Sequence, residues 1–294
     1  MPELPDIVVY QEHLQTRIVG QALRKVTLTN PFVLRTVDPP IADANGRRVE
    51  DVRRLGKRLV LALEGERFLV IHLMIAGRLR WRDAGGKAPG KIALASFAFD
   101  AGTLTLTEAG SKRRASLHYV AGEAALAALD PGGADVFALD AAQFAERLAR
   151  GNHTVKRALT DPRIFSGIGN SYSDEILHRA QLSPFVLGAK LAPADSARLY
   201  EATKQILAEW TQRLRDETGE AFPEKVTAFH DAMAVHGRYG KPCPVCGAPV
   251  QRIVYAENEA NYCARCQTGG KILADRALSR LLHDSWPKDI DQLL

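Results

Sequence analysis

The sequence predicts an α+β fold, in which an antiparallel β-sandwich with an opening helix precedes a helical domain and a four-cysteine zinc finger. Three observations predict this fold. Short β-rich runs fill residues 22–120, helical periodicity replaces them after residue 140, and the four cysteines form two Cys-x2-Cys pairs near the C-terminus. Runs of strands followed by runs of helices are typical of α+β proteins.

The first element that we expect is a helix. Apolar residues from Ile7 to Ile18 recur at helical spacing, Pro5 stands near the start and Gly20 just past the end. Proline is favoured in the first turn of a helix and glycine directly after the last. One amphipathic helix therefore opens the chain.

The β-rich segment follows this helix. Its runs are ALRKVTLT, RRVEDVRRL, KRLVLAL, RFLVIHLMIAGRLRW, ALASFAF, TLTLTE and ASLHYV. Asp100, Ala101 and Gly102 have the composition of a hairpin turn between two of them. So many short strands in about a hundred residues predict an antiparallel sandwich or barrel.

A boundary lies where the segment DPGGADVFALD separates the β-rich runs from the helical ones. We expect helices over 141–150, 153–161, 171–180 and 194–217, and a short amphipathic helix within ADRALSRLLHDSW after the last cysteine. The expected organisation is an N-terminal domain over 1–130, a linker over 131–140, a helical domain over 141–240, a zinc finger over 241–267 and an extension over 268–294.

The cysteines are Cys243, Cys246, Cys263 and Cys266, with sixteen residues between the two pairs. Two knuckles joined by a hairpin can present four thiolates to one Zn²⁺. Two disulfides, or four unrelated thiols, are the alternatives. A chain of 294 residues can bury a core without disulfides. Because four thiolates fill a tetrahedral site, we expect one structural zinc ion and no catalytic metal.

The charge pattern is compatible with a polyanionic partner. The formal net charge is +5 and the isoelectric point is about 9.0. Basic residues gather at Arg53, Arg54, Lys57 and Arg58, and again over 112–114. A solvated charged face is the alternative interpretation. With no apolar run of membrane-spanning length and no leader pattern, we expect a cytoplasmic protein that associates with the nucleoid when it is on DNA.

Six segments in this order resemble one known family, the Fpg/Nei DNA glycosylases. They are MPELPD, RRLGKRL, HLMIAGRL, SGIGNSYSDEIL, HGRYGKPCPVCG and YCARCQ, which together extend from the N-terminus to Gln267. The resemblance implies a helix, two turns, helix element for DNA binding in the helical domain. It also implies a monomeric base-excision-repair enzyme that removes a damaged base from double-stranded DNA and nicks the strand at the resulting abasic site.

The resemblance assigns catalysis to Pro2, Glu3 and Lys57. If Met1 is removed, Pro2 becomes a secondary amine that is partly neutral at pH 7 and can attack a sugar carbon. Glu3 would transfer protons, and Lys57 would reach the sugar-phosphate of the damaged nucleotide. A helix start, a first-turn charge and an exposed strand lysine are the ordinary interpretations of these three residues.

Further residues match DNA-binding positions of the family. Asn170 follows a glycine-rich turn at a helix start, where unpaired N–H groups favour a phosphate, and Lys156 matches a phosphate-contacting lysine. A flipped-out base leaves a gap that side chains must fill. Met74 and Ile75 match one wedge position. The second wedge loop has Arg113 and Arg114 but lacks the family's phenylalanine.

The finger also departs from the family. Asn258 stands where an arginine is usual, so phosphate binding there should be weaker and less dependent on salt. Residues 112–114, or Lys271, Arg276 and Arg280 in the extension, are the cations that we expect to compensate.

These departures keep a second function open, that of a protein which binds damaged or unusual DNA with weak or no glycosylase activity. A small-molecule enzyme with a proline base is a more distant alternative. The residues do not choose among oxidised purines, formamidopyrimidines and oxidised pyrimidines as the substrate base.

Overall fold

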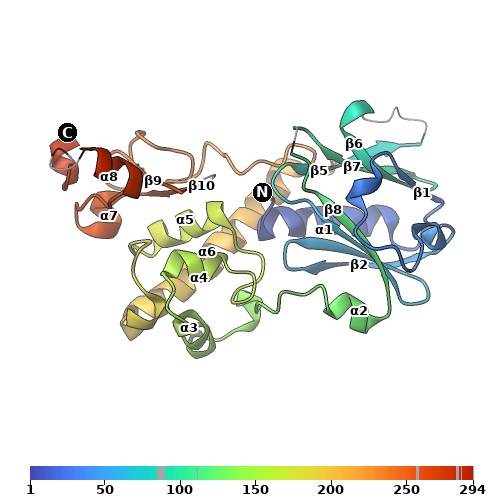
Figure 1. Cartoon of the computed structure of the whole chain (residues 1–294), viewed down its shortest axis with the longest axis horizontal. Helices are drawn as coiled ribbons and strands as arrows, with labels where there is room; N and C mark the ends of the chain where they lie inside the picture. The colour runs from blue at the N-terminus through green and yellow to red at the C-terminus, as the bar shows by residue number, and fades with distance from the viewer. Residues whose placement is uncertain (85–89, 111, 256–257, 283–284, 286, 294) are drawn as a thin grey trace. The chain divides into compact units, whose positions relative to one another are not determined.

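The computed structural model describes residues 1–84, 90–110, 112–255, 258–282, 285 and 287–293. It separates into two compact units, whose helices and strands are labelled in Figure 1. Unit 1 holds residues 1–132 and 209–228, and unit 2 holds residues 133–208 and 229–294. No helix in the described residues is long and apolar enough to span a membrane.

Unit 1 begins with α1 (Leu4–Ile18), the predicted opening helix. Tyr10, Leu14 and Ile18 are fully buried along one side of it. This apolar stripe packs into the same core as both sheets of the unit. The helix therefore forms part of the sandwich core, as its periodicity predicts.

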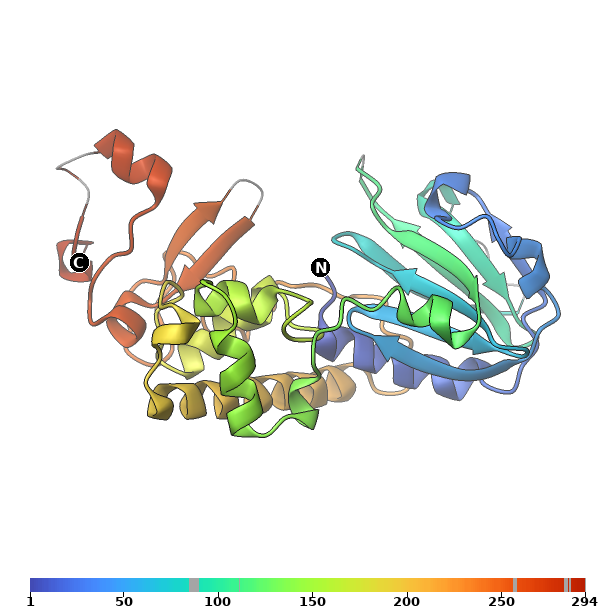
Figure 2. The ribbon, with the colours of Figure 1, turned by 60° about the horizontal axis from the view of Figure 1, so that its bottom comes forward.

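Two antiparallel four-stranded sheets make up the rest of unit 1. One has the order β1 (Lys25–Leu28), β6 (Ala93–Ala98), β7 (Gly102–Glu108), β5 (Gly77–Asp83), and the other β2 (Val49–Leu55), β3 (Arg58–Leu63), β4 (Arg67–His72), β8 (Ser116–Ala121). Figure 2 shows both sheets. The sandwich prediction is confirmed, and the predicted turn joins β6 to β7, where Phe99 N–H donates to Gly102 O at 2.8 Å.

Residues 209–228 pack on this sandwich although they follow the helical region in sequence. The ring of Phe222 lies 5.7 Å from that of Tyr10, between centroids. Glu224 forms an ion pair with Arg82, and Arg215 forms one with Glu12. The two compact units therefore have different boundaries from the domains expected from the sequence. The expected domains remain proposals about which parts of the chain carry which function.

Unit 2 contains the predicted helices. They are α3 (Ala141–Ala149), α4 (Val155–Thr160), α5 (Asn170–Arg179) and α6 (Pro193–Thr218), whose last ten residues belong to unit 1. Each predicted range agrees with its helix within two residues at either end. A helix that was not predicted, α2 (Glu123–Ala127), follows β8 in unit 1. The 3₁₀ turns are Pro31–Val33, Ile41–Ala44, Gly90–Ile92, Val136–Ala138, Gly188–Lys190 and Ile290–Leu293.

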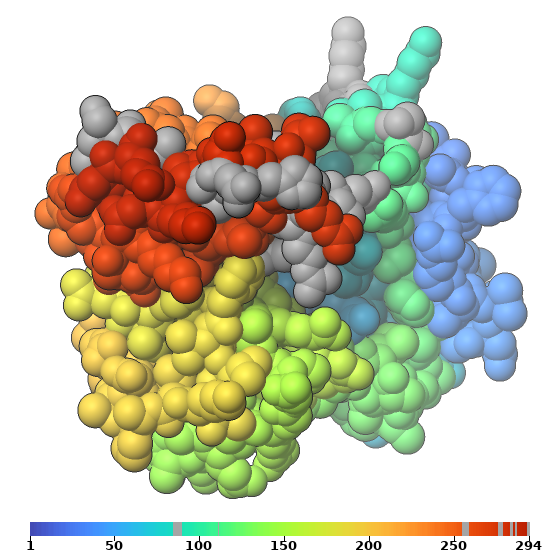
Figure 3. Space-filling view, turned by 60° about the vertical axis from the view of Figure 1, so that its left-hand side comes forward, coloured from blue at the N-terminus to red at the C-terminus, as the bar shows by residue number. Residues whose placement is uncertain are grey.

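The cysteine module completes unit 2. A hairpin of β9 (Gln251–Tyr255) and β10 (Asn258–Tyr262) is followed by α7 (Ala264–Thr268) and, in the extension, by α8 (Arg276–Leu282). Val250, Ile253 and Tyr262 form its small core together with the buried cysteines. The predicted short helix after the last cysteine is confirmed by α8, and Figure 3 shows the C-terminal residues in red beside the finger in orange.

Candidate functional site

The first candidate site lies at the N-terminus of α1. Pro2 is buried, and Glu3 is only 1% exposed. Asp6, in the first turn of the helix, accepts a hydrogen bond from Glu3 N–H at 2.8 Å through Oδ2. This bond fixes the backbone that joins Pro2 to the helix. The nitrogen of Pro2 lies in the peptide bond to Met1, so it is an amine only after Met1 has been removed.

The surroundings of the chain terminus favour a neutral amine. Burial lowers the pKa of the Met1 amino group; the negative charge of Glu3 opposes this shift, and the positive charge of Arg78 adds to it. Burial also raises the pKa of Asp6 to about 7. A weakly basic amine and a carboxyl that holds its proton near neutral pH are therefore close neighbours.

Lys57 joins this group from the turn between β2 and β3. Gly56, directly before it, has φ +62°, a conformation that glycine adopts without strain. Burial lowers the pKa of Lys57, and the carboxylate of Glu3 raises it. The structure thus brings the chain terminus, Glu3 and Lys57 into one electrostatic neighbourhood of unit 1.

Two histidines on the same sheet were missed by sequence reasoning. Arg58 pairs with His72 across β3 and β4, and His118 on β8 pairs with Val70, two residues before His72. Because side chains alternate along a strand, all three residues share one face. Burial lowers the pKa of His72 to about 4, with Arg58 and Lys57 adding to the shift. Burial and Arg58 also lower the pKa of His118. Basic side chains in an apolar run, as in RFLVIHL, are the signal that could have revealed this face.

The wedge candidates lie at this end of the sheets. Met74 has φ +54°, and Ile75 is 51% exposed in the turn between β4 and β5. Arg113 and Arg114 are exposed directly before β8, and Arg113 Nη2 donates to Lys91 O at 3.1 Å. Since β4 ends at His72 and β8 begins opposite it at Ser116, the two loops leave the sheet side by side. Neighbouring loops can therefore present these side chains together.

In unit 2, Asn170 begins α5 and Lys156 lies on α4. Asn170 Nδ2 donates to Glu259 O on β10 at 2.8 Å. Lys156 Nζ donates to Ser173 Oγ at 2.9 Å and forms an ion pair with Asp174. Asp174 also contacts His236 Nδ1 at 2.8 Å. The structure brings Asn170 and Lys156 together, but both groups already have partners within the protein.

The finger hairpin carries a cation that sequence reasoning missed. Arg252 on β9 lies over the ring of Tyr239, 4.3 Å from its centroid, and approaches Glu259 at 3.5 Å. Its guanidinium remains partly exposed. The side chains of Asn258 and Arg276 lie outside the described residues, while Lys271 and Arg280 are exposed. Arg252 is thus a further basic group on the finger hairpin, beside the expected ones.

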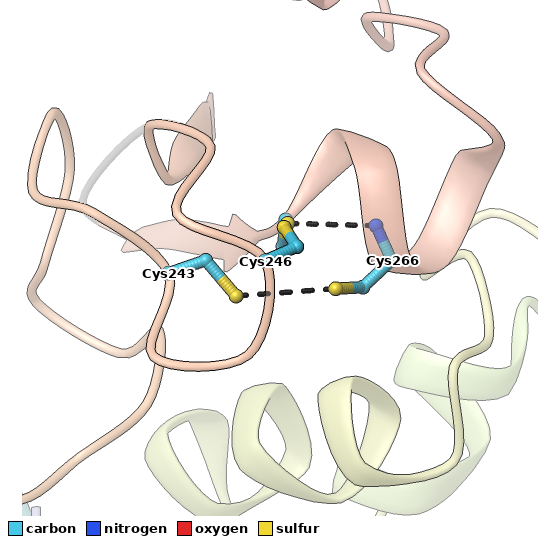
Figure 4. A group of neighbouring side chains, drawn as sticks. Cys243, Cys246 and Cys266 are labelled. Carbon is cyan, nitrogen blue, oxygen red and sulfur yellow. Dashed lines mark hydrogen bonds between the residues drawn. The ribbon is translucent and has the colours of Figure 1, made fainter.

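The four cysteines meet at one point of the finger. All four sulfur atoms lie within 4.8 Å of one another. The distance between sulfurs is 3.9 Å for Cys243 and Cys266 and 3.4 Å for Cys246 and Cys263. Figure 4 shows the thiols of the first knuckle facing α7, which carries Cys266. The cysteines are free, which excludes the disulfide alternative.

This geometry fits a zinc ion. Four sulfurs at about 2.3 Å from a tetrahedral Zn²⁺ lie roughly 3.8 Å apart, close to the observed distances. The surrounding donors suit thiolates, because Cys266 N–H donates to Cys263 Sγ at 3.5 Å and His178 Nε2 lies 3.3 Å from Cys243 Sγ. The four cysteines would hold zinc as a structural ion, and no ligand position would remain for water or substrate.

Three family models match the chain in sequence order. Residues 1–116 match the formamidopyrimidine-DNA glycosylase N-terminal domain, residues 129–218 match the H2TH domain of the same enzyme, and residues 240–269 match the zinc finger found in FPG and IleRS. The residues after 269 lie outside these matches.

Whole proteins and solved structures agree with the models. The formamidopyrimidine-DNA glycosylases of Thermus thermophilus and Variovorax paradoxus are each 33% identical over 279 residues; the alignments cover 92% and 91% of this chain and all of each relative. The crystal structure of the MutM (Fpg) protein from Thermus thermophilus has a TM-score of 0.76 at 32% identity, covering 90% of this chain and 98% of that one. A Lactococcus lactis Fpg structure with DNA that contains an abasic site has the same fold, with a TM-score of 0.80 at 23% identity, covering 90% and 99% of the two chains. The sequence, the fold and the cysteine cluster place this chain in the formamidopyrimidine-DNA glycosylase family.

Proposed function

We propose that this protein is a base-excision-repair DNA glycosylase that also cleaves the strand at abasic sites. The observation that carries the proposal is the set of groups around the N-terminus, where Glu3, Asp6 and Lys57 lie around the half-buried Met1 amino group and Pro2, the next residue, is buried. The relatives named as formamidopyrimidine-DNA glycosylases support it.

The chemistry begins when Met1 has been removed. The lone pair of the Pro2 nitrogen forms a bond to C1′ of the damaged nucleotide as the bond from C1′ to the base breaks, and the base leaves with that electron pair and a proton. The amine nitrogen loses its proton and its electron pair forms the C1′=N bond of an iminium ion as the C1′–O4′ bond breaks and O4′ takes up a proton. Loss of a C2′ proton gives an enamine, whose electrons then expel the 3′ phosphate. Glu3, next to Pro2 in the chain, is the carboxylate that would move these protons.

Neighbouring groups of unit 1 would hold the damaged nucleotide. Lys57 and Arg58 carry positive charge beside the terminus, and His72 adds a hydrogen-bond donor on the same face. Phosphate contacts of this kind fix the register of a protein on DNA without reading sequence. Met74 and Ile75, with Arg113 and Arg114, would fill the gap left by the flipped base.

Unit 2 would bind the DNA backbone through Asn170, Lys156 and the finger. The start of α5 offers backbone N–H groups to a phosphate. Arg252 would supply positive charge on the hairpin that carries Asn258, and the zinc ion would hold the hairpin in shape. We expect a monomer, because one chain supplies both the amine and the finger.

Two kinds of named complex support the proposed substrates, DNA with a damaged purine and DNA with an abasic site. Solved structures of Lactococcus lactis Fpg contain DNA with Fapy-dG or with an abasic site, and a MutM structure contains DNA with carbocyclic 8-oxo-G. We propose damaged purines of these types and abasic sites as substrates here. Abasic sites need no recognition of a base, so their cleavage should not depend on the lesion.

A protein that binds damaged or unusual DNA with weak or no glycosylase activity is the second candidate. The observation that favours it is the sequence itself, where the second wedge loop lacks a phenylalanine and Asn258 replaces an arginine. Such a protein would bind damaged duplexes and leave most or all lesions intact.

The test uses Met1-processed protein and 5′-labelled duplexes that carry 8-oxoguanine, a formamidopyrimidine, an oxidised pyrimidine or an abasic site. On a lesion duplex, a strand break that forms without alkali reports both base removal and strand cleavage, and a break that needs hot alkali reports base removal alone. On the abasic duplex, a break that forms without alkali reports strand cleavage. We expect direct cleavage of the abasic duplex and of at least one purine lesion. Binding without any break on all four duplexes would favour the second candidate.

A further inference from the structure

The hairpin of the finger is held from both edges at one residue pair. Val254 on β9 and Glu259 on β10 stand opposite each other in the register. Asn170 Nδ2 donates to Glu259 O at 2.8 Å from the β10 side. From the β9 side, Val254 N–H donates to Asp275 Oδ2, also at 2.8 Å. Only the pair Tyr255 and Asn258 separates these contacts from the hairpin turn.

Asp275 belongs to the extension that follows the family match. Its side chain is 2% exposed. The sheet of the finger has two strands, β10 and β9, so the outer edge of β9 has no strand beside it in the described part of the chain. An N–H group at such an edge has no partner from another strand, and a carboxylate makes a stronger bond with it than a neutral oxygen does. Asp275 provides that acceptor.

The extension is itself anchored to the zinc module. Its two ends pair with each other, because Ile272 N–H donates to Lys288 O at 2.9 Å and Ile290 N–H donates to Gly270 O at 2.8 Å. The side chains of Ile272 and Ile290 are buried in the core that includes Cys243 and Cys263. The segment around Asp275 therefore cannot move far from the metal centre.

The same segment also contacts β10. Leu273 N–H donates to the hydroxyl of Tyr262 at 2.8 Å, and the ring of Tyr262 is fully buried. Asp275 then stands directly before α8, with Ser279 N–H donating to its carbonyl oxygen at 2.8 Å. Successive contacts of the extension thus reach first Tyr262 at the end of β10 and then Val254 at the outer edge of β9. We call residues 270–293 the C-terminal clasp.

We propose that the C-terminal clasp aims the tip of the finger hairpin at the DNA backbone, and that Asp275 is the positioning residue through which it acts. Asn170 holds one edge from α5 and Asp275 holds the other, so the hairpin is held on both sides next to Asn258, which brings no charge of its own. The inference rests on the proposed function, because it assigns the hairpin to DNA binding.

The proposed positioning role of Asp275 can be distinguished from a catalytic role by measurement. The reacting groups belong to unit 1, whereas Asp275 contacts Val254 of the finger hairpin. Replacing Asp275 should weaken DNA binding, whereas the rate of the chemical step at saturating enzyme should stay the same. Loss of a hydrogen bond to a charged group corresponds to roughly a tenfold change in an equilibrium constant.

The experiment compares Asp275→Ala, Asp275→Asn and Asp291→Ala with the unchanged protein, each loaded with zinc. Asp291 is the matched control, since it lies in the same clasp but forms an exposed ion pair with Arg265 away from the hairpin. A duplex with a tetrahydrofuran abasic analogue gives Kd, a cleavable lesion gives the single-turnover rate, and hydrogen exchange follows residues 251–262.

We expect Asp275→Ala to raise Kd roughly tenfold, to speed hydrogen exchange in the hairpin, and to keep both the zinc ion and the saturated rate. Asp275→Asn, which retains an acceptor oxygen, should restore most of the affinity, and Asp291→Ala should behave like the unchanged protein. If Asp275→Ala releases zinc, the test rests on Asp275→Asn, whose neutral acceptor makes a weaker bond, so that Kd and hairpin exchange should both still rise, by less than a charged acceptor is worth.

Hairpin exchange and Kd that stay the same in both Asp275 variants would overturn the proposal. An equal loss in Asp291→Ala would also overturn it, because the effect would then belong to the extension in general. Failure of the unchanged protein to bind any damaged duplex would instead contradict the proposed function, so the two failures are distinguishable.

Discussion

Asp6 shows how a single buried residue can link the N-terminal site to pH. Its carboxyl lies one turn into α1, bonded to Glu3 N–H, and burial raises its pKa to about 7. In the unfolded chain the same group titrates near 3.8. Between these two values the folded protein binds a proton that the unfolded chain has lost, so folding becomes less favourable as the pH rises.

Replacing this group should remove the pH dependence. We expect the free energy of unfolding of the unchanged protein to fall relative to that of Asp6→Asn between about pH 4 and pH 7, by at most about 1.4 kcal/mol per pH unit. Thermal denaturation of both proteins across this range measures the difference. Parallel stability curves would show that Asp6 does not hold a proton in the folded state.

Lys57 should matter more for removing a base than for cutting an abasic site. Its ammonium group is partly buried near Glu3, where it can stabilise the developing charge of the reacting nucleotide. We expect Lys57→Ala to slow removal of a lesion base by roughly a hundredfold, with a smaller effect on a preformed abasic site. Single-turnover rates on the two duplexes give the ratio.

Arg53 is the control for this substitution. It lies on the same β2–β3 hairpin, but it is paired with Glu123 in an exposed position. Arg53→Ala should change both rates little. Equal losses on the two substrates in Lys57→Ala would assign Lys57 to general DNA binding.

At the scale of elements, the spacing of apolar residues predicts the helices, because a helix is encoded in the local sequence. The apolar residues of α1, α3 and α6 recur at helical spacing, so these helices were predicted almost to their ends. The contact between Phe222 and Tyr10 was not predictable, because a loop residue carries no periodic signal for its partner. The basic face with His118 was missed for a related reason, since strand alternation also fits a solvated side chain.

The candidate site was predictable to the extent that it lies in short motifs. The cysteines were found from their spacing, and the structure brings them together. Pro2 and Glu3 were assigned through the resemblance of the opening MPELPD to the family. Arg252 and Asp275 were not, because their roles depend on the register of β9 and β10 and on where the clasp meets that edge. Such contacts join residues that are distant in the sequence.

We expect the zinc finger to lose its structure independently of the sandwich when the metal is removed. Its core consists of finger and clasp residues, including the cysteines, so loss of the metal affects the hairpin and not the sandwich. We expect Cys263→Ser, or removal of zinc by a chelator, to weaken binding of an abasic duplex roughly ten- to a hundredfold.

The control is the core of unit 1. Hydrogen exchange in β3 and β4 should stay slow in the metal-free protein, and added zinc should restore binding to chelated protein. Full affinity of metal-free protein would mean that the finger contributes nothing to the interface.

At the scale of the whole molecule, two compact units carry different parts of one proposed activity. Unit 1 holds the amine, the carboxylates and the wedge residues, while unit 2 holds α5, the finger and the clasp. The net charge of +5 is modest, so affinity for DNA must come from where the cations lie and not from their number. The central claim concerns the covalent chemistry at Pro2.

Borohydride trapping tests that claim most directly. The Met1-processed protein and its Pro2→Gly variant are incubated with an abasic duplex, and borohydride reduces any iminium to a stable bond that gel electrophoresis and mass spectrometry detect. The account predicts a covalent product that maps to Pro2. Absence of that product, from protein whose mass shows that Met1 is gone, would contradict the account.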